Sequence, residues 1–133
     1  MYKQKFATDF KFGLEQEDAQ FDLIKQLDCD LVKTSVRSIF DYESKNSLVE
    51  LKSRNNCYNK YPTTMVGYNK IEYAHKFPEK TIYFCFKFTD GLYYYKYNKD
   101  DDLEFNIGGR RDRGRDEIKD YCYIPIKYLV KLE

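Results

Sequence analysis

The chain has little of the chemistry that marks zinc sites. Among its 133 residues there are four cysteines (Cys29, Cys57, Cys85 and Cys122), no C-x-x-C pair and a single histidine, His75. Zinc ligation needs closer cysteine pairs or several histidines, so we expect no zinc site. We instead expect reduced thiols in an intracellular protein, with Cys85 and Cys122 buried in strands and His75 at the surface.

Other absences exclude further classes. No stretch approaches the roughly 18 apolar residues of a membrane span, and no signal-peptide core follows Met1. We therefore expect a soluble protein. No phosphate-binding loop, dinucleotide fingerprint or G-x-S-x-G elbow occurs. The formal net charge is only +1, so any surface that binds nucleic acid must be a local cluster of cations.

Aromatic residues are abundant, with 14 tyrosines and 10 phenylalanines but no tryptophan. Hydrophobic residues make up 42% of the chain, which is ordinary for a globular protein. A chain of this length can bury a sizeable core, and we predict one domain over residues 1–133 with an unusually aromatic interior.

Hydrophobic periodicity predicts an alternation of helices and strands. In chain order we expect a helix at Leu14–Leu27, a short strand at Leu31–Lys33, two strands within Ser38–Arg54, a loop at Asn55–Gly67, a helix at Tyr68–Phe77 stopped by Pro78, and a buried strand at Thr81–Phe88. A hairpin partner at Leu92–Tyr97, a strand at Leu103–Ile107, a last strand at Tyr121–Ile126 and a short helix or tail at Lys127–Leu132 follow. Pro125 suggests that the last strand is an edge strand. The pattern predicts an α/β fold around a mixed sheet, with a β-rich C-terminal extension.

The strand pair within Ser38–Arg54 carries the residues of greatest chemical interest. We expect Asp41 near the end of the first strand and Glu50-Leu51-Lys52 in the second. Side chains alternate across a strand, so Glu50 and Lys52 share one face and Leu51 points to the other. Two acids can hold a hard cation, and a lysine can steady a water or the charge that develops on phosphate. The alternative is a same-face ion pair on an exposed strand, which contributes about 0.2–1 kcal/mol.

This arrangement resembles the active site of the PD-(D/E)XK nuclease superfamily, although Phe40 stands where the family name has proline. The resemblance implies an αβββαβ core, here about residues 13–88, with an accessory part at about 89–133. It further implies that Asp41, Glu50 and the carbonyl of Leu51 bind Mg²⁺ or Mn²⁺ and that Lys52 positions the attacking water.

A further acid extends the resemblance. Many members, including archaeal Holliday-junction resolvases, place a glutamate four residues after a glycine on the first helix, and Gly13 and Glu17 have this spacing. The resemblance then implies that Glu17 completes the metal site. The alternative is a surface acid that complements the helix dipole.

Several cations are candidates for contact with nucleic acid. Arg54 and Lys60 follow the Glu50–Lys52 strand, and Lys70 lies on the second predicted helix, where a solvated lysine is the alternative. A glycine-rich loop carries the one local cluster, formed by Arg110, Arg111, Arg113 and Arg115. Neighbouring acids leave a surface arginine–carboxylate network as the alternative for this loop.

These observations favour a metal-dependent nuclease that acts on DNA. By analogy with other small nuclease cores, we expect that two copies form a homodimer and address two strands. The hypothesis from another class is a non-catalytic module that binds nucleic acid or another partner and retains the nuclease fold.

Overall fold

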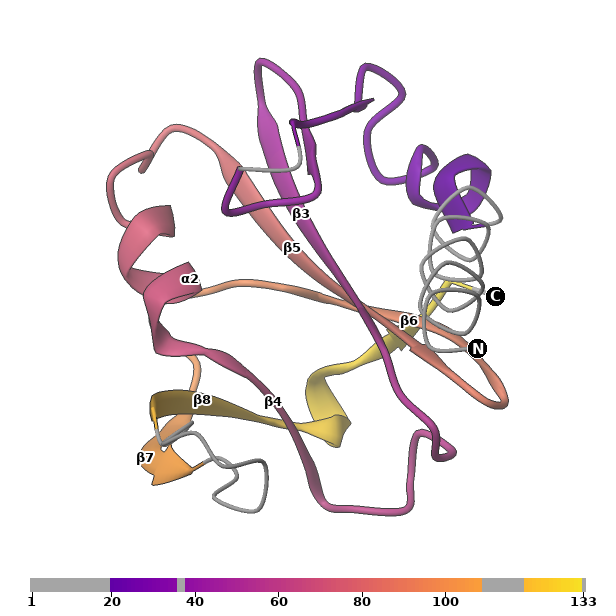
Figure 1. The fold of residues 1–133 in the computed structure, drawn as a ribbon, viewed down its shortest axis with the longest axis vertical. Coiled ribbons are helices and arrows are strands. Elements are labelled where there is room, and N and C mark those ends of the chain that lie inside the picture. Colours follow the sequence, from indigo (N-terminus) through magenta and orange to yellow (C-terminus); the bar gives the residue numbers. More distant parts are fainter. Residues whose placement is uncertain (1–19, 36–37, 109–118, 133) are drawn as a thin grey trace, which may run out of the picture.

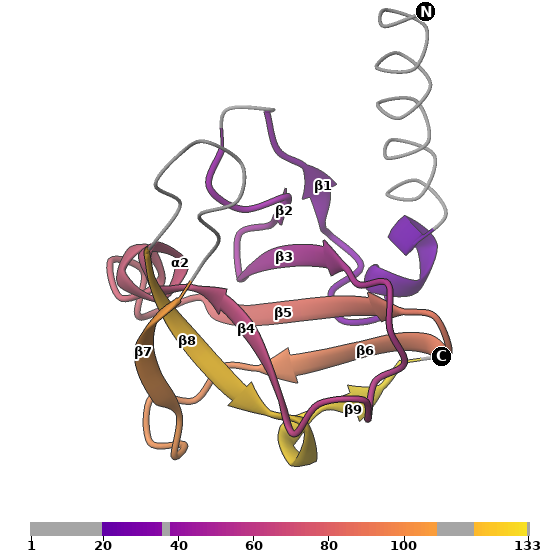
Figure 2. The same ribbon diagram turned by 60° about the horizontal axis from the view of Figure 1, so that its bottom comes forward.

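The computed structural model describes residues 20–35, 38–108 and 119–132 of the chain. In this part of the chain, two sheets form, with strand orders β1-β2-β3-β5-β6-β9 and β4-β8-β7 (Figures 1 and 2). The elements are β1 (Val32–Lys33), β2 (Tyr42–Glu43), β3 (Ser47–Ser53), β4 (Thr63–Gly67), α2 (Tyr68–Ala74), β5 (Thr81–Phe88), β6 (Gly91–Lys96), β7 (Glu104–Gly108), β8 (Lys119–Pro125), a 3-10 turn (Ile126–Tyr128) and β9 (Val130–Lys131). Residues 20–24 are helical as well.

The larger sheet is mixed. Its central strand β3 pairs in parallel with β5 and antiparallel with β2, while β5 pairs antiparallel with β6. The α/β class with a mixed sheet is therefore confirmed. No helix in the described part of the chain has both the length and the apolar character required to cross a lipid bilayer.

Each face of the larger sheet has its own hydrophobic core. Alternate residues of β5, such as Phe84 and Phe86, pack with α2 and with the smaller sheet. Between them, Cys85 points to the other face and packs with Ile24 from the helical residues 20–24. In Figure 1, α2 and this N-terminal helical segment accordingly lie on opposite sides of β3 and β5. Cover on both faces explains why β5 reads as a continuous apolar and aromatic run.

The β5–β6 hairpin is confirmed. The two strands pair from Tyr83 opposite Lys96 to Phe88 opposite Gly91. Gly91 has φ of 152°, a conformation that residues with a side chain rarely adopt, so glycine suits the end of this tight turn. The burial of Cys85 and Cys122 is also confirmed, and all four cysteines are free.

The interpretation of Asn55–Gly67 as one continuous loop is wrong. Its last five residues form β4, which leads directly into α2. Thr64 and Val66 are buried on one face of β4 while their neighbours are partly exposed, the alternation of a strand that covers a core. The partner strand β8 lies about sixty residues later in the chain, so no local sequence pattern predicts that β4 and β8 pair.

The expectation that Pro125 marks an edge strand is also wrong. β8 is the central strand of the smaller sheet, paired with both β4 and β7. Pro125 is tolerated because it lies opposite Thr63 at the end of β8, beyond the last β7 pair at Tyr123. Nor is β8 the last strand, since β9 follows the 3-10 turn and pairs with β6.

Both predicted helices end earlier in the chain than expected. α2 begins at Tyr68 as predicted but ends at Ala74, well before Pro78, and it buries Ile71 and Ala74. The described part of the first predicted helix is helical at residues 20–24 and continues as a turn to Leu27. Residues 14–19 of that prediction lie outside the described residues.

Candidate active site

The alternation predicted for the Glu50–Lys52 segment is present in β3. Glu50 lies opposite Phe84 of β5 on the face that α2 covers, whereas Leu51 packs with the core on the opposite face. Glu50 is only 3% exposed, so the alternative of an ion pair on an exposed strand does not describe this site. A charged residue this deeply buried on a strand requires compensation by other groups.

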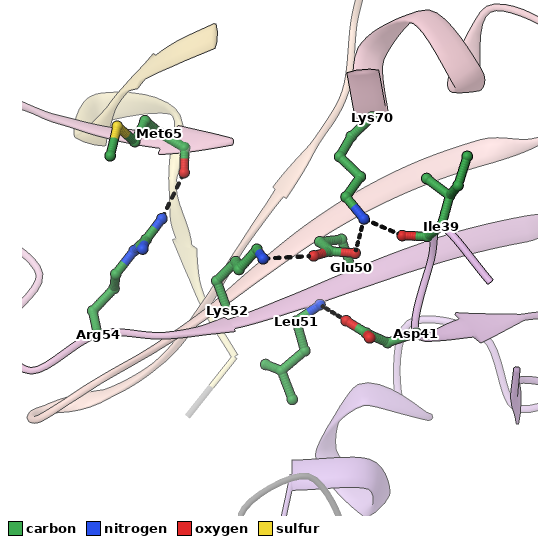
Figure 3. A network of polar contacts seen from close by, with 8 residues as sticks. All are labelled: Ile39, Asp41, Glu50, Leu51, Lys52, Arg54, Met65 and Lys70. Atoms are coloured by element: carbon green, nitrogen blue, oxygen red, sulfur yellow. Dashed lines mark hydrogen bonds and ion pairs between the residues drawn. The ribbon is translucent and has the colours of Figure 1, made fainter. Parts of the chain in front are cut away.

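Two lysines provide part of that compensation (Figure 3). Lys52 Nζ lies 3.2 Å from Glu50 Oε1, and its side chain is 42% exposed. Lys70 Nζ lies 3.4 Å from Glu50 Oε2 and also donates a hydrogen bond to the carbonyl oxygen of Ile39. Lys70 is therefore a partner of the buried carboxylate, and the alternative of a solvated lysine on α2 is contradicted. It reaches Glu50 because α2 packs across this face of β3.

The two lysines do not fully offset the cost of burying the negative charge of Glu50. Burial raises the pKa of Glu50 above its ordinary value of 4.5, and the charge of nearby Asp41 raises it further, against the opposing effects of Lys52 and Lys70. Oε2 is buried and accepts no hydrogen bond from any described residue, although Lys70 lies at ion-pair distance. The site thus holds negative charge that its surroundings, on balance, disfavour.

Asp41 lies directly before β2, not near the end of a strand as expected. A tight turn around Ser44, whose N–H donates to the Ser47 carbonyl at 2.9 Å, leaves β2 only two residues long. Tyr42 pairs with Val49, and the Asp41 N–H donates to the same Val49 carbonyl, so Asp41 lies beside β3 next to Glu50. The turn therefore brings Asp41 close enough for its charge to act on Glu50.

Asp41 also organises the main chain of β3. Its N–H donates to the Val49 carbonyl at 3.0 Å, and its Oδ2 accepts the N–H of Leu51 at 2.8 Å. The N–H and C=O of one strand residue point to the same edge, so the Leu51 carbonyl opens on the edge that Asp41 occupies. At this edge β3 extends beyond its last pair with β2.

The donor set suits a hard divalent cation. Asp41, Glu50 and the Leu51 carbonyl offer only oxygen, the ligand type that Mg²⁺ and Mn²⁺ prefer. The uncompensated charge of Glu50 is the feature that a bound cation would relieve. Glu17, the further acid expected here, lies outside the described residues.

A different cluster, Asp28, Cys29 and Asp30, brings three potential metal ligands within 4.8 Å of one another. These residues are consecutive, and Asp28 is already engaged by the hydroxyl of Ser44 at 2.5 Å and the N–H of Asp30 at 3.0 Å. Such bonds are typical of an aspartate that stabilises a turn, so the cluster is adequately explained without a metal ion.

Of the cations expected to bind nucleic acid, the structure describes Arg54, Lys60 and Lys70. Arg54 Nη2 donates to the Met65 carbonyl at 2.6 Å, and its guanidinium lies 5.9 Å from the ring centre of Phe86, so it links β3 to β4 (Figure 3). Lys60 is exposed, with Nζ 5.5 Å from the ring centre of Tyr61. The loop that carries Arg110, Arg111, Arg113 and Arg115 lies outside the described residues.

Sequence reasoning missed the residues that hold the Asp41 segment in place. The N–H of Thr34 donates to the Asp41 carbonyl at 3.0 Å, and its hydroxyl donates to the Phe40 carbonyl. Together these bonds fix the peptide groups on both sides of the Asp41 Cα atom. A single threonine in an extended segment gives no sequence signal for this role.

The chain also matches a known protein family. The family model described as "Phage putative PDDEXK endonuclease" matches residues 1–132. The chain belongs to this family. The match confirms the likeness to PD-(D/E)XK nucleases and extends it past the predicted core at 13–88, across the accessory part of the chain. No curated protein and no solved structure matches the chain significantly. Membership in a PDDEXK endonuclease family implies a nucleic-acid substrate.

Proposed function

We propose that this protein is a metal-dependent endonuclease that hydrolyses phosphodiester bonds of DNA at the Asp41–Glu50–Lys52 site. The observation that carries the proposal is the buried Glu50 carboxylate, which is destabilised in its charged form beside a second acid and two lysines. Perturbed acids of this kind are concentrated at functional sites, and the family of the chain supplies the reaction class.

Asp41, Glu50 and the Leu51 carbonyl would hold Mg²⁺ or Mn²⁺, with Glu17 as a further ligand. When bound, the cation polarises the phosphate and increases the acidity of a coordinated water. The buried carboxylate is suited to this task because its charge is weakly compensated by the protein. The hydrogen bond from the Leu51 N–H to Asp41 holds the Asp41 carboxylate against the edge of β3.

The two lysines have different tasks. Lys52 is half exposed and within 3.2 Å of Glu50, so it can reach both the carboxylate and a water or phosphate oxygen from the solvent side. We assign to it the orientation of the nucleophile and stabilisation of charge that develops on the phosphate. Lys70 is mostly buried and bound to Glu50 and to the Ile39 carbonyl, so we assign it a positioning role.

DNA contacts would come from Lys60 and from Arg110, Arg111, Arg113 and Arg115, as the sequence indicated. Arg54 and Lys70 were also predicted to contact nucleic acid. Their bonds to Met65 and to Glu50 imply that they would act mainly by shaping the surface. A homodimer in which two copies address two strands stays part of the proposal.

The test is cleavage of supercoiled plasmid and of a branched oligonucleotide in Mg²⁺, in Mn²⁺ and in EDTA. Glu50→Gln and Lys52→Ala are compared with matched controls, Glu43→Gln on β2 and Lys96→Ala on β6, both of which change exposed residues. We expect metal-dependent cleavage by the wild type and both controls, and a loss of at least about 100-fold in the two site variants. Cleavage that survives both site substitutions would refute the site.

The same experiment distinguishes the alternative function. A wild type that binds these DNAs but cuts none of them with any divalent cation would identify a non-catalytic nucleic-acid-binding module. Gel-shift measurements on the uncut samples provide this second readout.

A further inference from the structure

A cavity of about 400 Å³ opens where β3 ends, next to the proposed site. Its lining combines aromatic side chains, among them Tyr58, Tyr61 and Tyr123, with the guanidinium-bearing Arg54. This volume is within the range of small-molecule sites, about 300–1,000 Å³. A larger cavity of about 790 Å³, near the end of α2, includes none of the proposed site residues.

The aromatic walls differ in their contacts and exposure. Tyr58 stacks on Tyr93 with ring centres 4.7 Å apart and an interplanar angle of 20°, and its N–H donates to Asp90 Oδ1 at 3.1 Å. Tyr61, in contrast, is 55% exposed, and Lys60 Nζ lies 5.5 Å from its ring centre. A fixed ring and an exposed ring beside a cation form a surface suited to a flat, electron-rich ligand attached to a negative charge.

The cavity is continuous with the proposed catalytic strand. The N–H of Arg54 donates to the Lys87 carbonyl at 2.9 Å, so extended pairing with β5 continues to Arg54. At about 3.3 Å per residue, Arg54 lies about 7 Å along β3 from Lys52, on the same face. A group bound in the cavity would therefore lie beside a phosphate bound at Lys52.

Two of the alternative occupants fit less well. A free inorganic anion would not use the aromatic walls, and a purely apolar ligand would not use the positive charges of Arg54 and Lys60. A nucleotide satisfies both parts, because its base can stack on tyrosine while its phosphate meets Lys60 or Arg54.

We propose that this cavity receives one nucleobase of the substrate strand, next to the scissile phosphodiester, with Tyr61 as the stacking residue. This inference rests on the proposed function, because it identifies a substrate subsite of the same nuclease. A base must leave the duplex stack before it can enter the cavity. The inference therefore predicts a preference for single-stranded or branched DNA over intact duplex.

The test measures binding, not cleavage. Fluorescently labelled single-stranded and branched oligonucleotides are titrated with protein in EDTA, each carrying one abasic nucleotide at a different position. The wild type is compared with Tyr61→Ala and Tyr61→Phe. Phe105→Ala, which truncates another exposed aromatic residue (50% exposed) on β7, controls for loss of a surface ring. Lys60→Ala separates phosphate contact from base contact.

We expect one abasic position to weaken wild-type binding about 5- to 150-fold, the range of one lost stacking interaction. Tyr61→Ala should bind the intact strand as weakly as the wild type binds the strand with that abasic position. The affinity of Tyr61→Ala should not fall further when that abasic position is introduced. Tyr61→Phe and Phe105→Ala should behave as the wild type does. Lys60→Ala should lower the salt dependence of binding while the abasic effect persists.

Failure of this inference is distinguishable from failure of the proposed function. If the wild type cleaves DNA but Tyr61→Ala shows the same abasic profile as the wild type, the subsite is refuted and the nuclease stands. If the abasic effect depends on Tyr61 but no cation supports cleavage, the subsite stands and the nuclease is refuted. Binding to none of these DNAs in EDTA refutes the subsite, and the cleavage assay with divalent cations then decides the nuclease by itself.

Discussion

Substitution of Glu50 by glutamine is expected to stabilise the fold while it abolishes activity. The folded-state pKa of Glu50 is raised, above all by burial and then by Asp41. This direction already includes the attraction of Lys52 and Lys70, so the surroundings as a whole disfavour the charge. A neutral residue of the same shape removes the penalty, and we expect a gain in the free energy of unfolding on the order of 1 kcal/mol at pH 8.

The pH dependence gives a sharper form of this prediction. As pH rises above about 4.5, the unfolded chain ionises Glu50 before the folded chain does, so the free energy of unfolding falls. The fall ends once pH has passed the raised folded-state pKa. Glutamine does not titrate, so the stabilities of the two proteins should converge near pH 4.5 and differ most above the folded-state pKa.

The assay is urea unfolding followed by circular dichroism between pH 4.5 and pH 9, with Glu43→Gln as the exposed control. Equal m-values are required before midpoints are compared. Removal of one partner from a structural buried ion pair usually destabilises by about 3–5 kcal/mol. A loss of that size in Glu50→Gln at pH 8 would refute the reasoning, because Glu50 would then hold the fold together.

Three further predictions concern other parts of the molecule. A divalent cation should raise the melting temperature of the wild type but not of Glu50→Gln; at 100 times its Kd the gain is about 2.7 kcal/mol, and an equal shift in both proteins would exclude binding at Glu50. Arg54→Ala should destabilise by about 1–3 kcal/mol in urea because it leaves the Met65 carbonyl without its donor, whereas exposed Lys60→Ala should change stability by less than about 0.5 kcal/mol. In thiol labelling at pH 8 followed by mass spectrometry, exposed Cys29 should react quickly. Burial raises the pKa of Cys122 to about 11 and also raises that of Cys85, so quick labelling of either in the folded protein would contradict their burial.

Much of the larger sheet could be predicted because its signals are local. The run Thr81–Phe88, the turn at Gly91 and the helical spacing from Tyr68 each lie within a few residues. The smaller sheet could not be predicted in the same way. β4 acquires its partner β8 only through a contact between distant segments, and Pro125 is compatible with a central strand only because β7 stops short of it.

In the candidate site, too, some features follow from the local sequence and others depend on contacts between distant segments. Period-two alternation by itself determined that Glu50 and Lys52 share a face and that Leu51 does not. Family resemblance added the reaction class. Neither could indicate that Glu50 is buried, because burial depends on α2 and the smaller sheet covering that face.

By itself, then, the sequence determined the strands with local patterns and the order of side chains along β3. The tertiary structure decided which groups surround them. It placed Asp41 near Glu50 through a tight turn, brought Lys70 onto the same carboxylate from α2, and engaged Arg54 with β4. These contacts decide the charge balance of the site because electrostatic interactions depend on distance and burial in space, and neighbours in space need not be neighbours in the chain.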